Sequence, residues 1–249
     1  MNYQDINAKT IDAWVRGGWE WGKPISHETY ARALAGEWDV LLTPTKPVPH
    51  EWFGELRGRS LLGLACGGGQ QMPVFAALGA DCTVLDYSEM QLASDRAVAE
   101  REGFPLRIVR ADMTKPLPFP DGSFDLIFHP VSNCYVAEVL PIWQECCRVL
   151  RPGGVLLAGL DNGRNFAFDN EETALENVLP FDPLHNEWQR RQLEAAGDGF
   201  QFSHTIEEQI GGQLRAGFCL TDIYGDTNGS GNLHDHNIPT YWATRAVKK

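Results

Sequence analysis

Short apolar runs alternate with longer mixed segments through the middle of the chain. The runs occupy residues 60–65, 82–86, 106–111, 124–129 and 155–160. Their length and bounding turn residues are typical of buried strands. Between them, Ser88 with Gln91 predicts a capped helix that ends near Gly103. Alternation of strand and helix predicts an α/β fold, a mostly parallel sheet with helices on both faces.

The segment before this pattern has a different character. Residues 1–58 are rich in aromatic side chains and contain no clear strand, although residues 26–34 suit one helix. Residues 42–49 hold several prolines, which remove backbone donors and exclude a helix. We therefore interpret residues 1–58 as a cap or lid segment over a main domain that spans residues 59–249.

The segment after the fifth run is also irregular. Residues 161–204 are polar, and we interpret them as a lid-like insertion. Thr205 with Glu208 forms a capping box that opens a helix to about residue 216. The runs at 218–224 and 240–247 then predict a closing antiparallel hairpin, joined by a short loop.

Composition narrows the function classes. Acidic residues outnumber basic ones 33 to 21, for a net charge of −12, so the surface repels nucleic acid and anionic membranes. No apolar stretch is long enough to span a membrane. The 6 cysteines form no CxxC pair, and the polar N-terminus has no export signal, which favours a cytoplasmic protein. We expect no metal site, because the histidines of residues 234–236 have no further ligand in view. The oligomeric state is left open.

Glycines follow the first predicted strand directly. Gly67, Gly68 and Gly69 allow a ligand to approach the backbone, and the next helix begins there with free N–H groups. In such sheets ligands bind at the carboxyl ends of the strands. The turn therefore predicts a site for an anionic or carboxylate-bearing ligand.

Residues at the ends of the next two strands sharpen this expectation. Asp86 can accept hydrogen bonds from both ribose hydroxyls, and Tyr87 can stack on an adenine. Asp112 can accept from an adenine amino group while Met113 packs on the ring. Together they predict a nucleoside with a carboxylate-bearing tail. A dinucleotide is less favoured, because Met72 stands where its GxGxxG motif needs a third glycine.

With these motifs the chain resembles the class I S-adenosylmethionine-dependent methyltransferases of the "type 11" kind. The matching segments are residues 61–71, 84–88, 110–113, 117–127 and 145–154. The resemblance spans about residues 55–160. It implies a Rossmann-like seven-stranded sheet whose last strand is antiparallel, S-adenosylmethionine as cofactor, and methyl transfer as the reaction.

The first motif departs from the family pattern. Gly63 stands in place of the usual acidic residue, and Ala65 in place of the first glycine. We interpret both as traits of a subgroup. A catalytically silent cofactor-binding module is the alternative, and an NAD-dependent oxidoreductase is a weaker one.

The resemblance and the motif positions together give a set of expected site residues. The cofactor-binding residues would be Ala65, Cys66, Gly67, Gly69, Gln70, Gln71, Asp86, Tyr87, Gln91, Ala111, Asp112, Met113 and His129. His129 follows the fourth strand and is also the expected catalytic base, since its ordinary pKa suits one. Substrate contacts are expected from Trp14, Trp19, Asn133 and Tyr135. The acceptor is expected to be a small molecule, through O, N, C or S.

Overall fold

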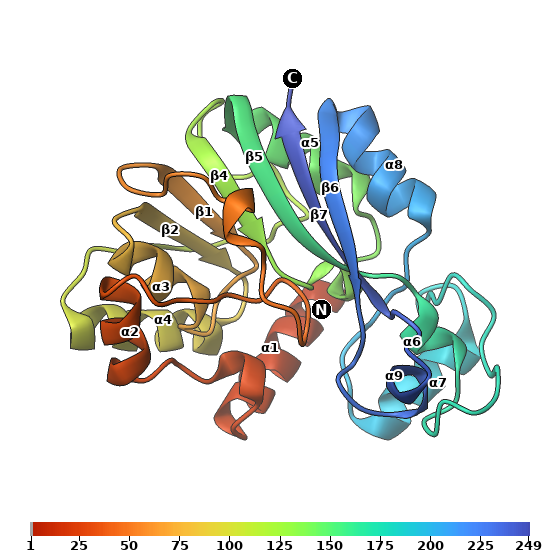
Figure 1. Cartoon of the computed structure of the whole chain (residues 1–249). Coiled ribbons are helices and arrows are strands. Elements are labelled where there is room, and N and C mark those ends of the chain that lie inside the picture. Colours follow the sequence, from red (N-terminus) through yellow and green to blue (C-terminus); the bar gives the residue numbers. More distant parts are fainter. Residues whose placement is uncertain (1) are drawn as a thin grey trace.

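The computed structural model describes residues 2–249 and shows one twisted sheet flanked by helices (Figure 1). Residue 1, the first of the expected cap, lies outside the described residues. The strands are β1 Ser60–Leu64, β2 Asp81–Asp86, β3 Arg107–Arg110, β4 Phe124–His129, β5 Leu150–Asp161, β6 Phe218–Asp226 and β7 Tyr241–Lys248. They are ordered β3-β2-β1-β4-β5-β7-β6 in a 7-stranded sheet. Strands β1 to β5 pair in parallel, and β7 is antiparallel to β5 and β6, which confirms the predicted sheet.

Nine α-helices occur within residues 2–249, and the sequence signals explain several of their ends. They are α1 Tyr3–Arg16, α2 His27–Leu34, α3 Gln71–Ala77, α4 Glu89–Glu102, α5 Leu140–Val149, α6 Arg164–Ala167, α7 Glu187–Ala196, α8 Ile206–Ala216 and α9 Asn232–Asp235. Ser88 accepts from the Gln91 N–H at the start of α4, and Gly103 ends that helix in the left-handed conformation. Thr205 and Glu208 form the complete capping box of α8. None of these helices is long and apolar enough to cross a membrane.

Alternation along the strands divides the core between the two faces of the sheet. Leu61, Leu126 and Leu157 belong to one apolar cluster, which α2, α3 and α4 cover. The neighbouring Leu62 and Ile127 belong to the other cluster, which α5 and α8 cover. Helices on both faces leave the carboxyl ends of the parallel strands as the edge where a ligand can enter.

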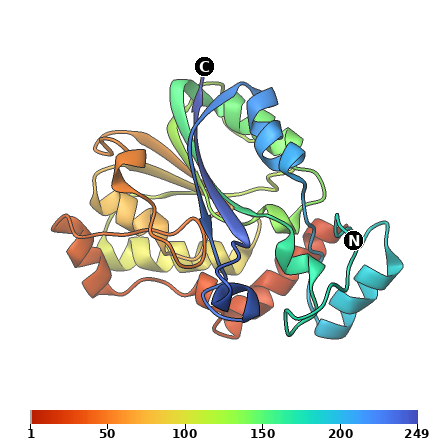
Figure 2. The same ribbon diagram turned by 45° about the vertical axis from the view of Figure 1, so that its right-hand side comes forward.

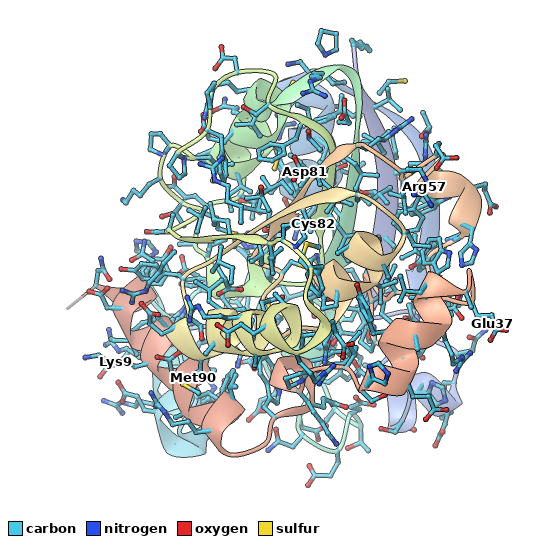
Figure 3. All side chains as sticks on the ribbon, turned by 90° about the vertical axis from the view of Figure 1, so that its left-hand side faces the viewer. Lys9, Glu37, Arg57, Asp81, Cys82 and Met90 are labelled. Atoms are coloured by element: carbon cyan, nitrogen blue, oxygen red, sulfur yellow. The ribbon has the colours of Figure 1, made fainter. Side chains whose placement is uncertain are left out.

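The N-terminal segment does more than cap the sheet. Residues 33–56 contribute buried side chains to the first cluster, so that part belongs to the main core. Helix α1, which the sequence pattern did not predict, lies alongside α4 (Figure 3). Asp12 of α1 accepts from the Ser88 hydroxyl at 2.6 Å and from the Met90 N–H at 3.0 Å. These bonds join the segment to the start of α4.

Two connections differ from the sequence expectation. Residues 161–204 contain the helices α6 and α7. Residues 227–240 join β6 to β7 and include α9, where a short loop was expected. Both connections gather with α1 at one end of the sheet (Figure 2). Residues of the first connection and Asn228 of the second line a cavity at that end, a tertiary role that the local turn signals do not encode.

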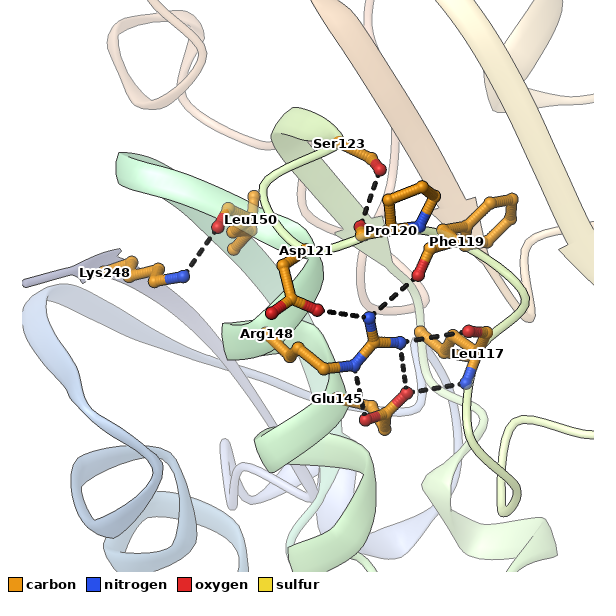
Figure 4. Close-up of polar contacts among 9 residues, drawn as sticks. All are labelled: Leu117, Phe119, Pro120, Asp121, Ser123, Glu145, Arg148, Leu150 and Lys248. Atoms are coloured by element: carbon orange, nitrogen blue, oxygen red, sulfur yellow. Dashed lines mark hydrogen bonds and ion pairs between the residues drawn. The ribbon is translucent and has the colours of Figure 1, made fainter.

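Arg148 of α5 anchors the loop before β4 (Figure 4). Arg148 donates to the carbonyl oxygens of Leu117 at 3.0 Å and Phe119 at 2.8 Å. It also pairs with Glu145 at 2.6 Å and Asp121 at 2.9 Å. Glu145 in turn accepts from the Leu117 N–H at 2.6 Å. The motifs at 117–127 and 145–154 therefore meet in space as one scaffold.

Candidate functional site

A cavity of about 950 Å³ opens at the carboxyl ends of the parallel strands. We call one side of the cavity the strand-end wall, and its residues are Ala65, Gly67, Gln70, Gln71, Asp86, Tyr87, Ser88, Gln91, Ala111, Asp112 and Met113. We call a second side the insertion wall, and its residues are Asp161, Asn165, Phe166, Phe168, Asp169, Glu172, Glu176, Phe181 and Asp198. Its size is at the upper end of the range for small-molecule sites, roughly 300–1,000 Å³.

The turn after β1 needs its glycines. Gly68 and Gly69 have φ of +114° and +67°, the region that side chains disfavour. A Cβ on Gly67 would lie 2.6 Å from the Gln91 Cβ and 3.0 Å from the Asp86 Oδ2. Ala65 itself has φ of +46°, so an alanine adopts the conformation for which the family pattern has glycine. The backbone is thereby open toward the cavity.

Asp86 joins the glycine turn to the start of α4. Its Oδ2 accepts from the Gly67 N–H at 3.0 Å and its Oδ1 from the Ser88 N–H at 2.9 Å. Burial raises the pKa of this carboxyl, and the backbone bonds oppose that rise. A carboxylate has further lone pairs, so Asp86 can still accept from hydroxyls in the cavity.

The next residues of the strand-end wall are fixed by their neighbours. The Tyr87 hydroxyl donates to Asp5 of α1 at 2.8 Å, and the Arg110 guanidinium lies 5.1 Å from the Tyr87 ring centre. Asp112 accepts from the Thr114 N–H at 2.8 Å, and Met113 is 8% exposed. The wall thus presents a carboxylate, an aromatic ring and a thioether at the ends of β2 and β3.

Two glutamines, Gln70 and Gln91, tie the N-terminal segment to the glycine turn, and a third, Gln71, bonds within the turn. Gln70 donates to the Glu20 carbonyl at 2.7 Å, and Gln91 donates to the Trp21 carbonyl at 3.3 Å. Gln71 lines the cavity and accepts from the Cys66 thiol at 3.5 Å. The Oε1 of Gln91 is buried and has no hydrogen-bond partner in the described structure. It lies where a Cβ on Gly22 or Gly68 would come within 3.1 Å or 3.0 Å of it, so it is packed between the N-terminal segment and the glycine turn.

The structure does not bring His129 to the cavity. Its side chain is fully buried, with Nδ1 2.8 Å from the Leu64 carbonyl and Nε2 2.9 Å from the Asn133 amide oxygen. Burial lowers its pKa, and its ring makes an edge-to-face contact with Trp143. As the last residue of β4 it points to the face covered by α5, and both ring nitrogens have protein partners. The expected base therefore occupies a structural position.

The structure places the other expected site residues either at the cavity or behind its wall. Trp19 and Tyr135 line the cavity. Trp14 contacts both rings from outside it, with ring centres 5.2 Å and 6.3 Å away. Asn133, Cys66 and Gly69 are buried behind the wall, and Asn133 donates to Gln209 at 3.1 Å. These residues support the cavity without facing it.

The sequence reasoning missed the insertion wall. Asp161 ends β5 and is 6% exposed; its oxygens accept from the Gly163 N–H at 2.6 Å and the Asn165 amide at 2.8 Å. Burial raises the pKa of Asp161 to about 6. The pKa of Tyr135 is raised by burial and also by the nearby Tyr241, Asp198 and Asp161. The sequence offered a signal for one residue of this wall, because Asp161 is a carboxylate at a strand end.

Comparisons with known proteins agree with this geometry. The family described as "Methyltransferase domain" matches residues 62–158. The chain is 42% identical over 252 residues to the uncharacterized methyltransferase YbaJ of Bacillus subtilis (strain 168), with 97% of each protein covered. It is 28% identical to the sterol 24-C-methyltransferase ERG6B of Gibberella zeae, over 74% of this chain and 45% of that protein.

Solved structures show the same fold. An S-adenosylmethionine-dependent methyltransferase from Mesorhizobium loti superposes with a TM-score of 0.64 at 20% identity. The superposition covers 80% of this chain and 94% of that one. At this identity the likeness concerns the fold alone.

The strand-end wall fits S-adenosylmethionine. Gly67 and Asp86 line the cavity together, and Asp86 supplies a carboxylate for ribose hydroxyls. Asp112 lies in the same wall and adds a second carboxylate for the polar cofactor. Fold, site and the relationship to YbaJ agree, and the chain belongs to the class I S-adenosylmethionine-dependent methyltransferases.

Proposed function

We propose that the protein transfers the methyl group to a small molecule held against the insertion wall. The observation that carries this proposal is the single continuous cavity, which adds a second set of walls to those suited to the cofactor. S-adenosylmethionine supplies a methyl already activated by positive sulfur. The residues of this chain then bind, orient and exclude water, and orientation alone contributes up to roughly 7–11 kcal/mol in favourable cases.

The charge of the insertion wall favours one class of acceptor. Asp161, Asp169, Glu172, Glu176 and Asp198 line it, and no Lys, Arg or His of residues 2–249 lines any part of the cavity. An anionic acceptor would meet repulsion there with no cation to offset it. Aromatic rings beside the carboxylates suit a cationic group as well. The proposed acceptor is therefore a small molecule that carries an amine.

Asp161 is the proposed proton acceptor when the acceptor atom must lose a proton. It is buried at the end of β5, lines the cavity, and has a pKa raised to about 6. A carboxyl with this pKa is ionised at neutral pH yet basic enough to take a proton. Nucleic acid is not proposed as a substrate, because the net charge of −12 opposes its approach.

A labelling experiment tests the charge of the acceptor. The protein is incubated with tritiated-methyl S-adenosylmethionine and two metabolite pools, one retained on a cation exchanger and one on an anion exchanger. Label is expected to enter only the pool that the cation exchanger retains. Label confined to the pool that the anion exchanger retains would overturn the proposed acceptor class. Binding of S-adenosylhomocysteine with no transfer to either pool would favour the silent cofactor-binding module.

A further inference from the structure

A second buried carboxylate lies directly behind the glycine turn. Asp95, on the second turn of α4, is 0% exposed. Its Oδ2 accepts from the Gly68 N–H at 3.0 Å, across 27 residues of sequence. A buried carboxylate in this fold needs such a partner, and the Gly68 N–H needs an acceptor because water cannot reach it.

The glycine turn and α4 are packed without space between them. A Cβ on Gly69 would lie 2.8 Å from the Ser94 carbonyl oxygen, so the turn rests on the backbone beside Asp95. The Gly68 N–H also lies 3.1 Å from the Gln91 carbonyl oxygen. Helix α4 therefore determines where the backbone of this turn can lie.

The space beside position 63, where the family pattern has an acid, is occupied by Met72. A Cβ on Gly63 would lie 2.7 Å from both the Sδ and the Cε of Met72. Both residues are fully buried, so Met72 fills the space that a side chain at 63 would need. No carboxylate can reach the turn from β1 without displacing Met72.

We infer that Asp95 is the positioning residue of the cofactor turn and replaces, from α4, the carboxylate that is absent at Gly63. This inference rests on the binding of S-adenosylmethionine at the turn and concerns how the turn is held open for it. Burial and the neighbouring Asp86 raise the pKa of Asp95 well above its usual value. The contact with the Gly68 N–H uses one oxygen, Oδ2, and an asparagine amide oxygen can fill the same role.

Two substitutions at position 95 test the inference by calorimetry with S-adenosylhomocysteine. Asp95→Ala removes the side-chain acceptor and leaves the Gly68 N–H with the Gln91 carbonyl oxygen alone, so the turn loses its tie to the Asp95 side chain and affinity is expected to fall about tenfold. Asp95→Asn keeps an amide oxygen in place, and affinity is expected to stay within about threefold of the wild type. Rescue by asparagine separates positioning of the turn from a requirement for charge.

A matched control separates positioning from general stability. Thr244→Val also removes a buried hydrogen bond, 3.2 Å long to Gln213, far from the turn. It is expected to lower the unfolding midpoint without changing affinity. If the alanine variant does not fold, Asp95→Ser takes its place, since its shorter hydroxyl does not reach Gly68 and the same weakening is expected.

Two results would overturn the inference. One is a folded Asp95→Ala or Asp95→Ser variant that binds as tightly as the wild type. The other is an asparagine variant as weak as the alanine variant. In both cases the wild-type protein still binds the ligand, so methyltransferase function stands. Absence of binding by the wild type would instead contradict the function itself.

Discussion

A polar residue at a strand end lies either in the core or at the cavity, depending on the direction in which its side chain points. His129 and Asp161 end the neighbouring strands β4 and β5. His129 points into the layer below α5 and is enclosed, whereas Asp161 lines the cavity. The sequence shows that both are polar strand ends, but only the packed structure shows which one the cavity reaches. The cavity therefore reaches Asp161 and not His129, which is why Asp161 is the proposed proton acceptor.

The raised pKa of Asp161 predicts a pH profile. Methyl transfer is expected to increase as pH rises through about 6, because the carboxyl must be ionised to accept a proton. Asp161→Asn should lower turnover more than cofactor affinity and remove this limb of the profile. Rates measured from pH 5 to 8 for both proteins check the prediction. A wild-type profile that is flat across this window would contradict it.

The same group provides a stability control. Its folded pKa lies above its unfolded value, so its favourable contribution is complete below the unfolded pKa, near 4, and is lost as pH rises through about 6. The free energy of unfolding of Asp161→Asn, taken relative to that of the wild type, should therefore be higher at pH 7 than at pH 4. Urea unfolding at these two pH values gives the comparison.

Elements were predictable where their signals were local. The capped ends of α4 and α8 follow from neighbouring residues, and the strands follow from short apolar runs. Helix α1 was missed although Asn2 caps its first turn and Gly17 follows its end, and its distant bonds, from Ser88 to Asp12 and from Tyr87 to Asp5, were not predictable. The insertion was predicted as a segment, but its helices and their place around the cavity were not.

At the scale of elements, Arg148 is expected to be the strongest tie between α5 and the loop before β4. Arg148→Gln removes its ion pairs and most of its donors, and should lower the free energy of unfolding by about 2–3 kcal/mol. Chemical denaturation checks the value. Lys248→Gln, which affects one bond to the Leu150 carbonyl, is the control and should cost much less. Equal losses in the two variants would contradict this assignment.

Across the whole molecule, sequence motifs locate the cofactor side of the cavity better than the acceptor side. Gly67, Asp86 and Asp112 lie near the ends of consecutive strands, so the parallel sheet brings them together. The support from Asp95 was not predictable, because its partner Gly68 is 27 residues away and nothing in the helix pattern marks the contact. The acceptor side depends on long connections whose course is set by tertiary packing.

Binding of the cofactor product is the most direct test of the account. Titration calorimetry of S-adenosylhomocysteine into the wild-type protein should give saturable binding of one molecule per chain. Asp86→Ala should weaken it about 10- to 150-fold, as expected for the loss of one or two charge-assisted hydrogen bonds. Absence of binding by folded wild-type protein, or equal affinity in the Asp86→Ala variant, would contradict the cofactor site described for this methyltransferase.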